Sequence, residues 1–266
     1  MLAFTQLKGF LMMPSERFLL AHPDRFLEDI LEHPQEDAPR LRYADWLEEQ
    51  GNCLGELIRV QCRLARMPVN HLGILELEAR EQKLLAEHGQ EWAGDLADMV
   101  GWWTFRRGFV EEISLSVDKF LAGACSLYQR APIQEVHVSD LSEQTEALAA
   151  CPYLQRVTYL DLSNNLMRDH GLKQLAKSPH LAHVRGLNLS SCGIGDGGLM
   201  ALAASPHLGD LHEVYLSDNR ISSAGVRAFV HTILARRIQI LHLRFNPIGV
   251  ASADLLQRRL GDKVQL

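Results

Sequence analysis

The chain of 266 residues has no long apolar run and no paired cysteine motif. The apolar patch at 10–13 is too short for the core of a signal peptide, and Met13 is an alternative start. The five cysteines form no Cys-x-x-Cys pair, and such an odd set of thiols indicates a reducing compartment. Cys62, Cys125 and Cys192 lie among apolar neighbours and are expected in the core. We therefore expect a cytoplasmic protein that does not enter a membrane.

Positive charge is also scarce. The net charge is −6 and is uneven, because residues 1–105 carry −8 and residues 106–266 carry +2. Neither part offers the basic stripe that neutralises a phosphate backbone. This distribution argues against a nucleic-acid partner.

One pattern is abundant and recurs four times in the second half. The tracts 157–165, 184–192, 211–219 and 238–246 each read apolar-x-x-Leu/Val-x-Leu-x-x-Asn/Cys. Their ninth positions are 27 residues apart, which is typical of a leucine-rich repeat that stacks as a strand-and-helix solenoid. Such a solenoid usually acts by offering a surface.

Weaker copies precede these four, at Val110–Leu115 and Ile133–Val138. Six strands are therefore expected near 110–116, 133–139, 157–163, 184–190, 211–217 and 238–244. Helical spacing follows the first three regular strands, and the tracts Cys151-Pro, Ser178-Pro and Ser205-Pro mark where a helix must stop. We expect an α/β solenoid of about six repeats over 106–266, with parallel strands on the concave face and helices on the convex face. The tail at 263–266 leaves open whether a further strand caps the end.

The region 1–105 has no such repeat and shows helical spacing in four segments, at 23–32, 39–51, 53–67 and 71–92. Pro39 is expected at the first position of its helix, and Gly51 is expected to end it. We expect an all-α module that caps the solenoid.

Part of this module resembles a known family. The tracts 24–31, 36–51 and 55–61, with Arg-Leu-Arg-Tyr-Ala-Asp-Trp-Leu-Glu-Glu at 40–49, resemble the bacterial repeat-companion domain over about 22–67. That family is a short helical segment found beside leucine-rich and other repeats. The tract 105–109 resembles the entry to the first strand in such proteins. The repeats are similar to the ribonuclease-inhibitor-like class, in which Asn and Cys alternate at the ninth position. Neither resemblance implies a reaction or a cofactor.

The ninth positions are interpreted as an internal ladder. An inward amide has both a donor and an acceptor, and it can satisfy backbone groups that a turning loop leaves buried. A Cys packs as a small apolar group and bonds more weakly. The proposed ladder is Asn165, Cys192, Asn219 and Asn246.

Strand alternation places other side chains on the concave, solvent side. These residues form the candidate surface for a protein partner, because Tyr and Arg are enriched at binding hot spots and Ile240 is apolar. The alternative is a polar face that contacts only solvent and binds no partner. The candidate set is Tyr159, Asp161, Asn188, Glu213, Tyr215, Ile240, His242 and Arg244.

The sequence contains two possible chemical sites and favours neither. Ser114, His137 and Asp161 have the order of a hydrolase triad, but no strained turn or oxyanion donors accompany them. His180 and His207 recur 27 residues apart, yet two histidines without a carboxylate or thiol make a poor metal site. We expect no metal.

An aromatic cluster follows the helical module. A solenoid exposes its apolar core at its ends, and something must cover it. Trp102, Trp103, Phe105 and Phe109 are interpreted as this plug, rather than as an aromatic ligand box.

These observations favour a monomeric, non-enzymatic module that binds a protein through the concave face. A second hypothesis is a regulator of a small GTPase, with the turns at Asn164, Ser191, Asp218 and Phe245 as the working edge. It rests on analogy of fold alone. The hydrolase is the third and least favoured hypothesis.

Overall fold

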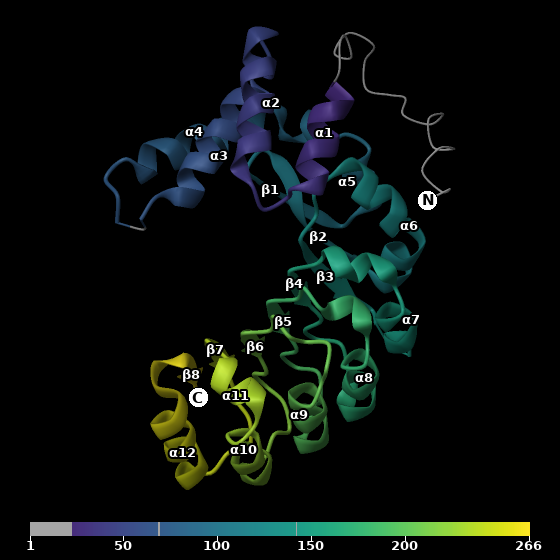
Figure 1. Ribbon diagram of the computed structural model, residues 1–266, viewed down its shortest axis with the longest axis vertical. Helices are drawn as coiled ribbons and strands as arrows, with labels where there is room; N and C mark the ends of the chain where they lie inside the picture. The colour runs from purple at the N-terminus through teal and green to yellow at the C-terminus, as the bar shows by residue number, and fades with distance from the viewer. Residues whose placement is uncertain (1–22, 69, 142) are drawn as a thin grey trace. The chain divides into compact units, whose positions relative to one another are not determined.

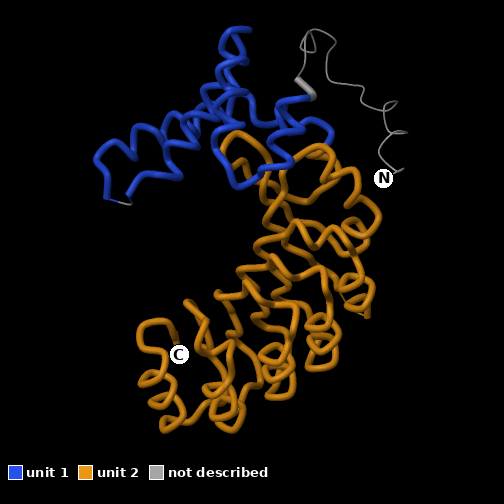
Figure 2. The backbone as a smooth tube through the Cα atoms, viewed as in Figure 1, with its two compact units in different colours: residues 1–95 blue, residues 96–266 orange. Residues whose placement is uncertain are grey.

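A computed structural model describes residues 23–68, 70–141 and 143–266 (Figure 1). Met13 and the first residue of the companion-like segment therefore lie outside the described residues. The chain divides into two compact units, 1–95 and 96–266, which Figure 2 shows in blue and orange.

The described residues of the first unit form helices. They are α1 (Pro23–Glu32), α2 (Asp37–Glu49), α3 (Leu54–Arg66) and α4 (Ile74–Ala93). Helix α2 begins two residues before Pro39, so this proline lies inside the first turn rather than at its first position. Gly51 follows α2 with a φ of 71°, a conformation that costs glycine little.

The companion-like residues mainly hold α2 against α3. A Cβ on Gly55 would lie 2.7 Å from the Ala44 carbonyl oxygen, so only glycine allows this approach. Arg40 is fully buried and donates to the Pro34 carbonyl at 2.9 Å. Arg59 of α3 pairs with Glu48 of α2 at 2.8 Å. This motif is thus explained by helix packing.

The second unit contains one eight-stranded sheet whose strands follow in sequence order. Strand β1 pairs antiparallel with β2, and every later pair is parallel. The strands are β1 (Trp102–Arg106), β2 (Phe109–Ser116), β3 (Glu135–Ser139), β4 (Tyr159–Asp161), β5 (Gly186–Asn188), β6 (Glu213–Tyr215), β7 (Ile240–His242) and β8 (Val264–Gln265).

Helices lie along one side of the sheet, and all except the first come after a strand in the sequence (Figure 1). They are α5 (Leu96–Met99), α6 (Val117–Arg130), α7 (Thr145–Ala149), α8 (Arg168–Leu175), α9 (Asp196–Ala203), α10 (Ser223–Phe229), α11 (Ile233–Arg237) and α12 (Val250–Leu260), with 3-10 helices η1 (Pro152–Arg156), η2 (Pro179–Leu181) and η3 (Gly261–Lys263). A proline opens η1 and η2 because its fixed φ suits the first helical turn.

The core lies between the strands and these helices. Leu160, Leu187, Val214 and Leu241 pair in register across β4 to β7 and are 0–1% exposed. Consecutive members are 27 residues apart, so the interval in the sequence sets the register of the sheet. Burial of such side chains stabilises by about 1.5–3 kcal/mol each.

The chain leaves each regular strand through a residue with positive φ. Asn164, Ser191, Asp218 and Phe245 have φ between 54° and 61°, which turns the backbone inward. The turn buries backbone N–H and C=O groups that the sheet does not pair.

Asn side chains satisfy these groups. The Asn219 amide nitrogen donates to the carbonyls of Leu189 and Leu216 at 2.8 and 3.1 Å. Its oxygen accepts from the backbone N–H of Cys192 and Ile194 at 3.2 and 2.8 Å. Asn165 and Asn246 make equivalent bonds to their own and the preceding repeat.

Cys192 fills the second rung differently. Burial raises the pKa of its thiol to about 11, so the thiol stays protonated and donates to the Leu162 carbonyl at 3.1 Å. A thiol is a poor acceptor. An Asn at position 192 would accept a hydrogen bond from the backbone N–H of Met167. With Cys there, this N–H instead donates to the Asn165 carbonyl at 2.6 Å.

Two features differ from the sequence-based expectations, and one question that the sequence left open is answered. The expected boundary at 105/106 differs from the structure, because β1 pairs with β2 and residues 96–105 belong to the second unit. The tail left open in the sequence forms β8, which pairs with β7. Cys125 is exposed, so its placement in the core was wrong; it lies on the outer side of α6.

The Asn219→Ala change should lower the free energy of unfolding by about 1–3 kcal/mol, because it leaves buried backbone groups without partners. Urea unfolding would measure this loss against Arg220→Ala, an exposed neighbour expected to change stability by less than about 0.5 kcal/mol. Equal losses in the two variants would contradict the role of the amide.

Candidate functional site

Two rows of side chains run across the sheet on the side away from the buried residues. We call them together the strand face. The first row is Trp102, Ser114, His137, Asp161, Asn188, Tyr215, His242 and Gln265. The second row is Thr104, Glu112, Glu135, Tyr159, Gly186, Glu213 and Ile240. Parallel neighbours in such rows lie about 4.8 Å apart.

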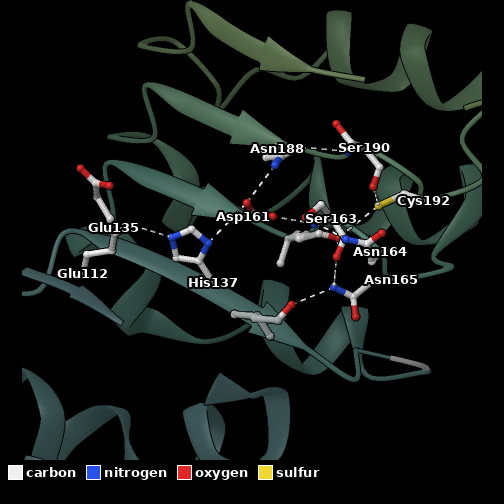
Figure 3. Close-up of polar contacts among 12 residues, drawn as sticks. Glu112, Glu135, His137, Asp161, Ser163, Asn164, Asn165, Asn188, Ser190 and Cys192 are labelled. Carbon is white, nitrogen blue, oxygen red and sulfur yellow. Dashed lines mark hydrogen bonds and ion pairs between the residues drawn. The ribbon is translucent and has the colours of Figure 1, made fainter. Parts of the chain in front are cut away.

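His137 is the centre of a charged network at the β1 end (Figure 3). Its Nε2 lies 2.8 Å from Glu112, and its Nδ1 lies 3.4 Å from Asp161. Asp161 also accepts from the side chain of Asn188 at 2.8 Å and from the N–H of Ser163 at 2.8 Å. Every oxygen of this carboxylate is thus engaged within the sheet.

This network shifts the pKa of both groups. Hydrogen bonds to Asp161 and Glu112 outweigh burial and raise the pKa of His137. Burial alone would raise the pKa of Asp161, but hydrogen bonds from His137, Ser163 and Asn188 lower it to about 2. The network therefore favours the imidazolium form of His137 and the carboxylate form of Asp161.

Aromatic rings continue the strand face across the sheet. The Trp102 ring meets His137 edge-on at 5.9 Å, and His137 lies 6.3 Å from Tyr159. Tyr159 meets Tyr215 at 6.3 Å, and Tyr215 meets His242 at 4.6 Å, both edge to face. This chain of rings reaches from β1 to β7 and is half-buried or exposed throughout. We call it the aromatic row.

Gly186 makes room for the aromatic row. A Cβ at this position would lie 2.4 Å from Cδ2 of Tyr159, so the ring occupies the place of a side chain on β5. Tyr159 can thereby reach Tyr215, two strands away. The sequence offered a signal, since Gly186 is the single glycine among the outward strand positions.

The remaining candidate surface residues lie toward the last strands. Ile240 and His242 are half-buried in β7, and Arg244 is exposed beyond the end of that strand. Burial and Arg244 lower the pKa of His242, so its ring is neutral near pH 7. The aromatic row therefore ends in an uncharged imidazole.

The four expected plug residues occupy different environments. Phe105 is buried opposite Val110, whereas Trp103 and Phe109 are half-buried in the β1–β2 hairpin. Trp102 is 48% exposed and lies in the first row of the strand face. Its position makes it a further surface candidate, which sequence reasoning missed because β1 has no repeat counterpart.

The three residues of the hydrolase hypothesis are in register on neighbouring strands. Both ring nitrogens of His137 face carboxylates, and among the described residues no hydrogen bond joins this ring to Ser114. A base must accept a proton from its nucleophile, and a ring whose two nitrogens both face carboxylates is poorly placed to do so. The arrangement does not form a catalytic triad.

The described residues gather no group of three or more metal-ligating side chains. His180 and His207 occupy repeated Ser-Pro turns. Their backbone N–H groups donate to the hydroxyl oxygens of Ser178 and Ser205 at 3.3 and 3.2 Å. The turn explains their spacing. No helix in the part of the chain that is described is long and apolar enough to span a membrane.

The turns of the GTPase hypothesis form one edge of the sheet. Ser191 donates to Asp218 at 2.9 Å, and both residues have positive φ. Phe245 is 83% exposed at the corresponding position of the last regular repeat. These contacts join neighbouring turns and do not by themselves indicate a nucleotide-dependent partner.

A comparison with protein families matches part of this unit. A family model described as Leucine Rich repeat matches residues 180–203 and 210–230. Residues 180–230 thus contain two leucine-rich repeats, a class whose members generally mediate protein–protein interaction. No curated protein matches the chain.

The His137 network should make stability depend on pH. The pKa of His137 is higher in the folded chain, so its ionic contacts stabilise fully below about 6.5 and less as pH rises through the folded pKa. Asp161 stays ionised over this range. The His137→Gln change should lower the free energy of unfolding at both pH values. The loss should be larger at about pH 5.5 than at about pH 9.

Urea unfolding at the two pH values provides the measurement, with His170→Gln as control. His170 is exposed on α8 and has no ion pair among the described residues. An unchanged difference between wild type and His137→Gln at both pH values would contradict the proposed charge state.

The contact between Tyr159 and Gly186 should appear as a coupling energy. Gly186→Ala should cost about 1–3 kcal/mol through overpacking, and nearly nothing once Tyr159 is also Ala. Gly209→Ala is the control, because no atom lies within 4 Å of its added Cβ. Additive losses in a double-mutant cycle would show that the ring does not lie over Gly186.

Proposed function

We propose that the chain is a non-enzymatic protein-binding module whose second unit is a short leucine-rich-repeat solenoid of the ribonuclease-inhibitor-like class. The concave surface of this solenoid is the strand face. The observation that supports this proposal is the aromatic row. Five rings spread over β1 to β7 form a band of amphipathic surface that the second unit does not cover.

Physical chemistry favours binding at such a surface. Tyr and Trp provide large contact areas with little loss of side-chain entropy, and they are enriched at hot spots. Hydrogen bonds and neighbouring strands already fix Tyr159, Asp161 and Asn188 before a partner arrives. Preorganised groups lose less free energy on association.

We propose a monomeric, cytoplasmic protein that binds a protein partner and uses no metal or cofactor. The proposed binding surface is the strand face rather than the acidic first unit. The GTPase regulator gains no specific support from the turn contacts, so the general binding role is the one we retain.

Photo-crosslinking tests where a partner docks. A photoreactive amino acid at position 215 on the strand face should capture a protein in lysate of the source organism, and the same amino acid at position 177 should not. Lys177 is exposed after α8, on the helix side of the repeat. Adducts only from position 177, or equal adducts from both positions, would contradict the proposed surface.

A captured partner then permits an affinity measurement. Tyr215→Ala should weaken binding of the purified proteins by about 1–3 kcal/mol, whereas Lys177→Ala should leave it unchanged. Calorimetric titration would read both variants against wild type.

A further inference from the structure

Glu213 differs from the other carboxylates of the strand face. Glu112 and Glu135 pair with Arg106, and Asp161 pairs with His137. Glu213 is half-buried and has no cation within ion-pair distance among the described residues. Burial raises the pKa of the adjacent Tyr215 hydroxyl, and the negative charge of Glu213 raises it further. One negative charge in the second row is thus left uncompensated.

The chain itself shows how this face accommodates a cation. Arg106 extends from β1 and places its guanidinium 2.8 Å from Glu112 and 3.1 Å from Glu135. Its pKa is raised despite burial, because these carboxylates favour the charged form. The same row continues through Tyr159 and Gly186 to Glu213. In the part of the chain that the structure describes, no arginine lies within ion-pair distance of Glu213.

Two aromatic rings flank Glu213. Tyr159 lies over Gly186, the residue paired with Glu213, and Tyr215 is two residues further along the same strand. Asp161, Glu135 and Glu213 all oppose ionisation of Tyr159, whose pKa is raised chiefly by burial. The rings therefore lie in a negative field and present faces that attract cations.

We propose that Glu213, Tyr159 and Tyr215 form a subsite for an arginine or lysine side chain of an extended, basic segment of the partner protein. This inference rests on the proposed function and names the chemistry of the partner. The cation would pair with Glu213 and pack against the tyrosine rings, as Arg106 pairs with Glu112 and Glu135 at the β1 end.

A protein side chain fits this subsite better than a metal ion. One carboxylate supplies too few ligands for a metal, and phenol rings bind organic cations through their faces. Ile240, next to Glu213 in the row, offers apolar surface for the aliphatic stem of the cation. The strand face thus provides charge, rings and apolar area within four consecutive strands, β4 to β7.

Synthetic peptides test the subsite in the full chain. The probes are a fluorescent peptide of alternating glycine and arginine, its lysine counterpart, and a glutamine counterpart of equal length. Fluorescence anisotropy should show binding of the two basic peptides, weakened by added salt, and no binding of the glutamine peptide.

Matched variants locate the binding. Glu213→Gln and Tyr215→Leu should each weaken the arginine peptide about tenfold, whereas Tyr215→Phe keeps the ring and stays within about twofold. Glu146→Gln on α7 and Glu91→Gln on α4 remove the same charge from exposed sites and should have no effect. Melting temperatures would establish that each variant is folded.

The remaining outcomes overturn the subsite. Binding lost in Glu91→Gln but kept in Glu213→Gln would assign basic ligands to the acidic first unit. Absence of peptide binding, or equal binding by every folded variant, would also refute it. If the glutamine peptide binds as well and Tyr215→Leu weakens both, the strand face binds protein without selecting cations, and only the proposed function survives.

Discussion

The hydrogen bonds from the ladder side-chain amides to the backbone of the turns keep consecutive repeats of the second unit in register. A residue with positive φ follows each regular strand, and the turn there directs N–H and C=O groups into the interior. Asn219 joins backbone atoms of two consecutive repeats through one side chain. Because an unpaired buried group costs about 1–3 kcal/mol, the ladder penalises any slip between repeats. The ladder thereby also fixes which side chains are neighbours on the strand face.

The strand face depends on this register. His137 meets Asp161, and Asp161 meets Asn188, because each pair is in register on neighbouring strands. A slip of one residue would exchange buried and exposed positions and break these contacts. At the β1 end Arg106 pairs with Glu112 and Glu135, whereas Glu213 lies beside two rings with no cation at ion-pair distance among the described residues. We therefore infer different roles for the two ends: structural organisation near β1 and recognition near β6.

Periodicity predicts what repeats and misses what does not. The interval of 27 was sufficient to align Leu160, Leu187 and Val214, since equal spacing implies equal register. The hairpin strand β1 was missed because it has no second copy. For the strand face, alternation indicates which side chains point outward but not their contacts. The course of Tyr159 over Gly186 and the reach of Arg106 to Glu135 depend on rotamers and neighbours distant in sequence.

Hydrogen exchange at single amides tests the ladder most directly. In wild type, the N–H groups of Leu141, Ile194 and Ile221 should be protected, because each donates to an Asn side chain. In Asn219→Ala, Ile194 should lose protection while Leu141 and Ile221 keep theirs, since Asn165 and Asn246 still hold them. Unchanged protection at Ile194, or an equal loss at all three amides, would contradict a ladder that acts rung by rung.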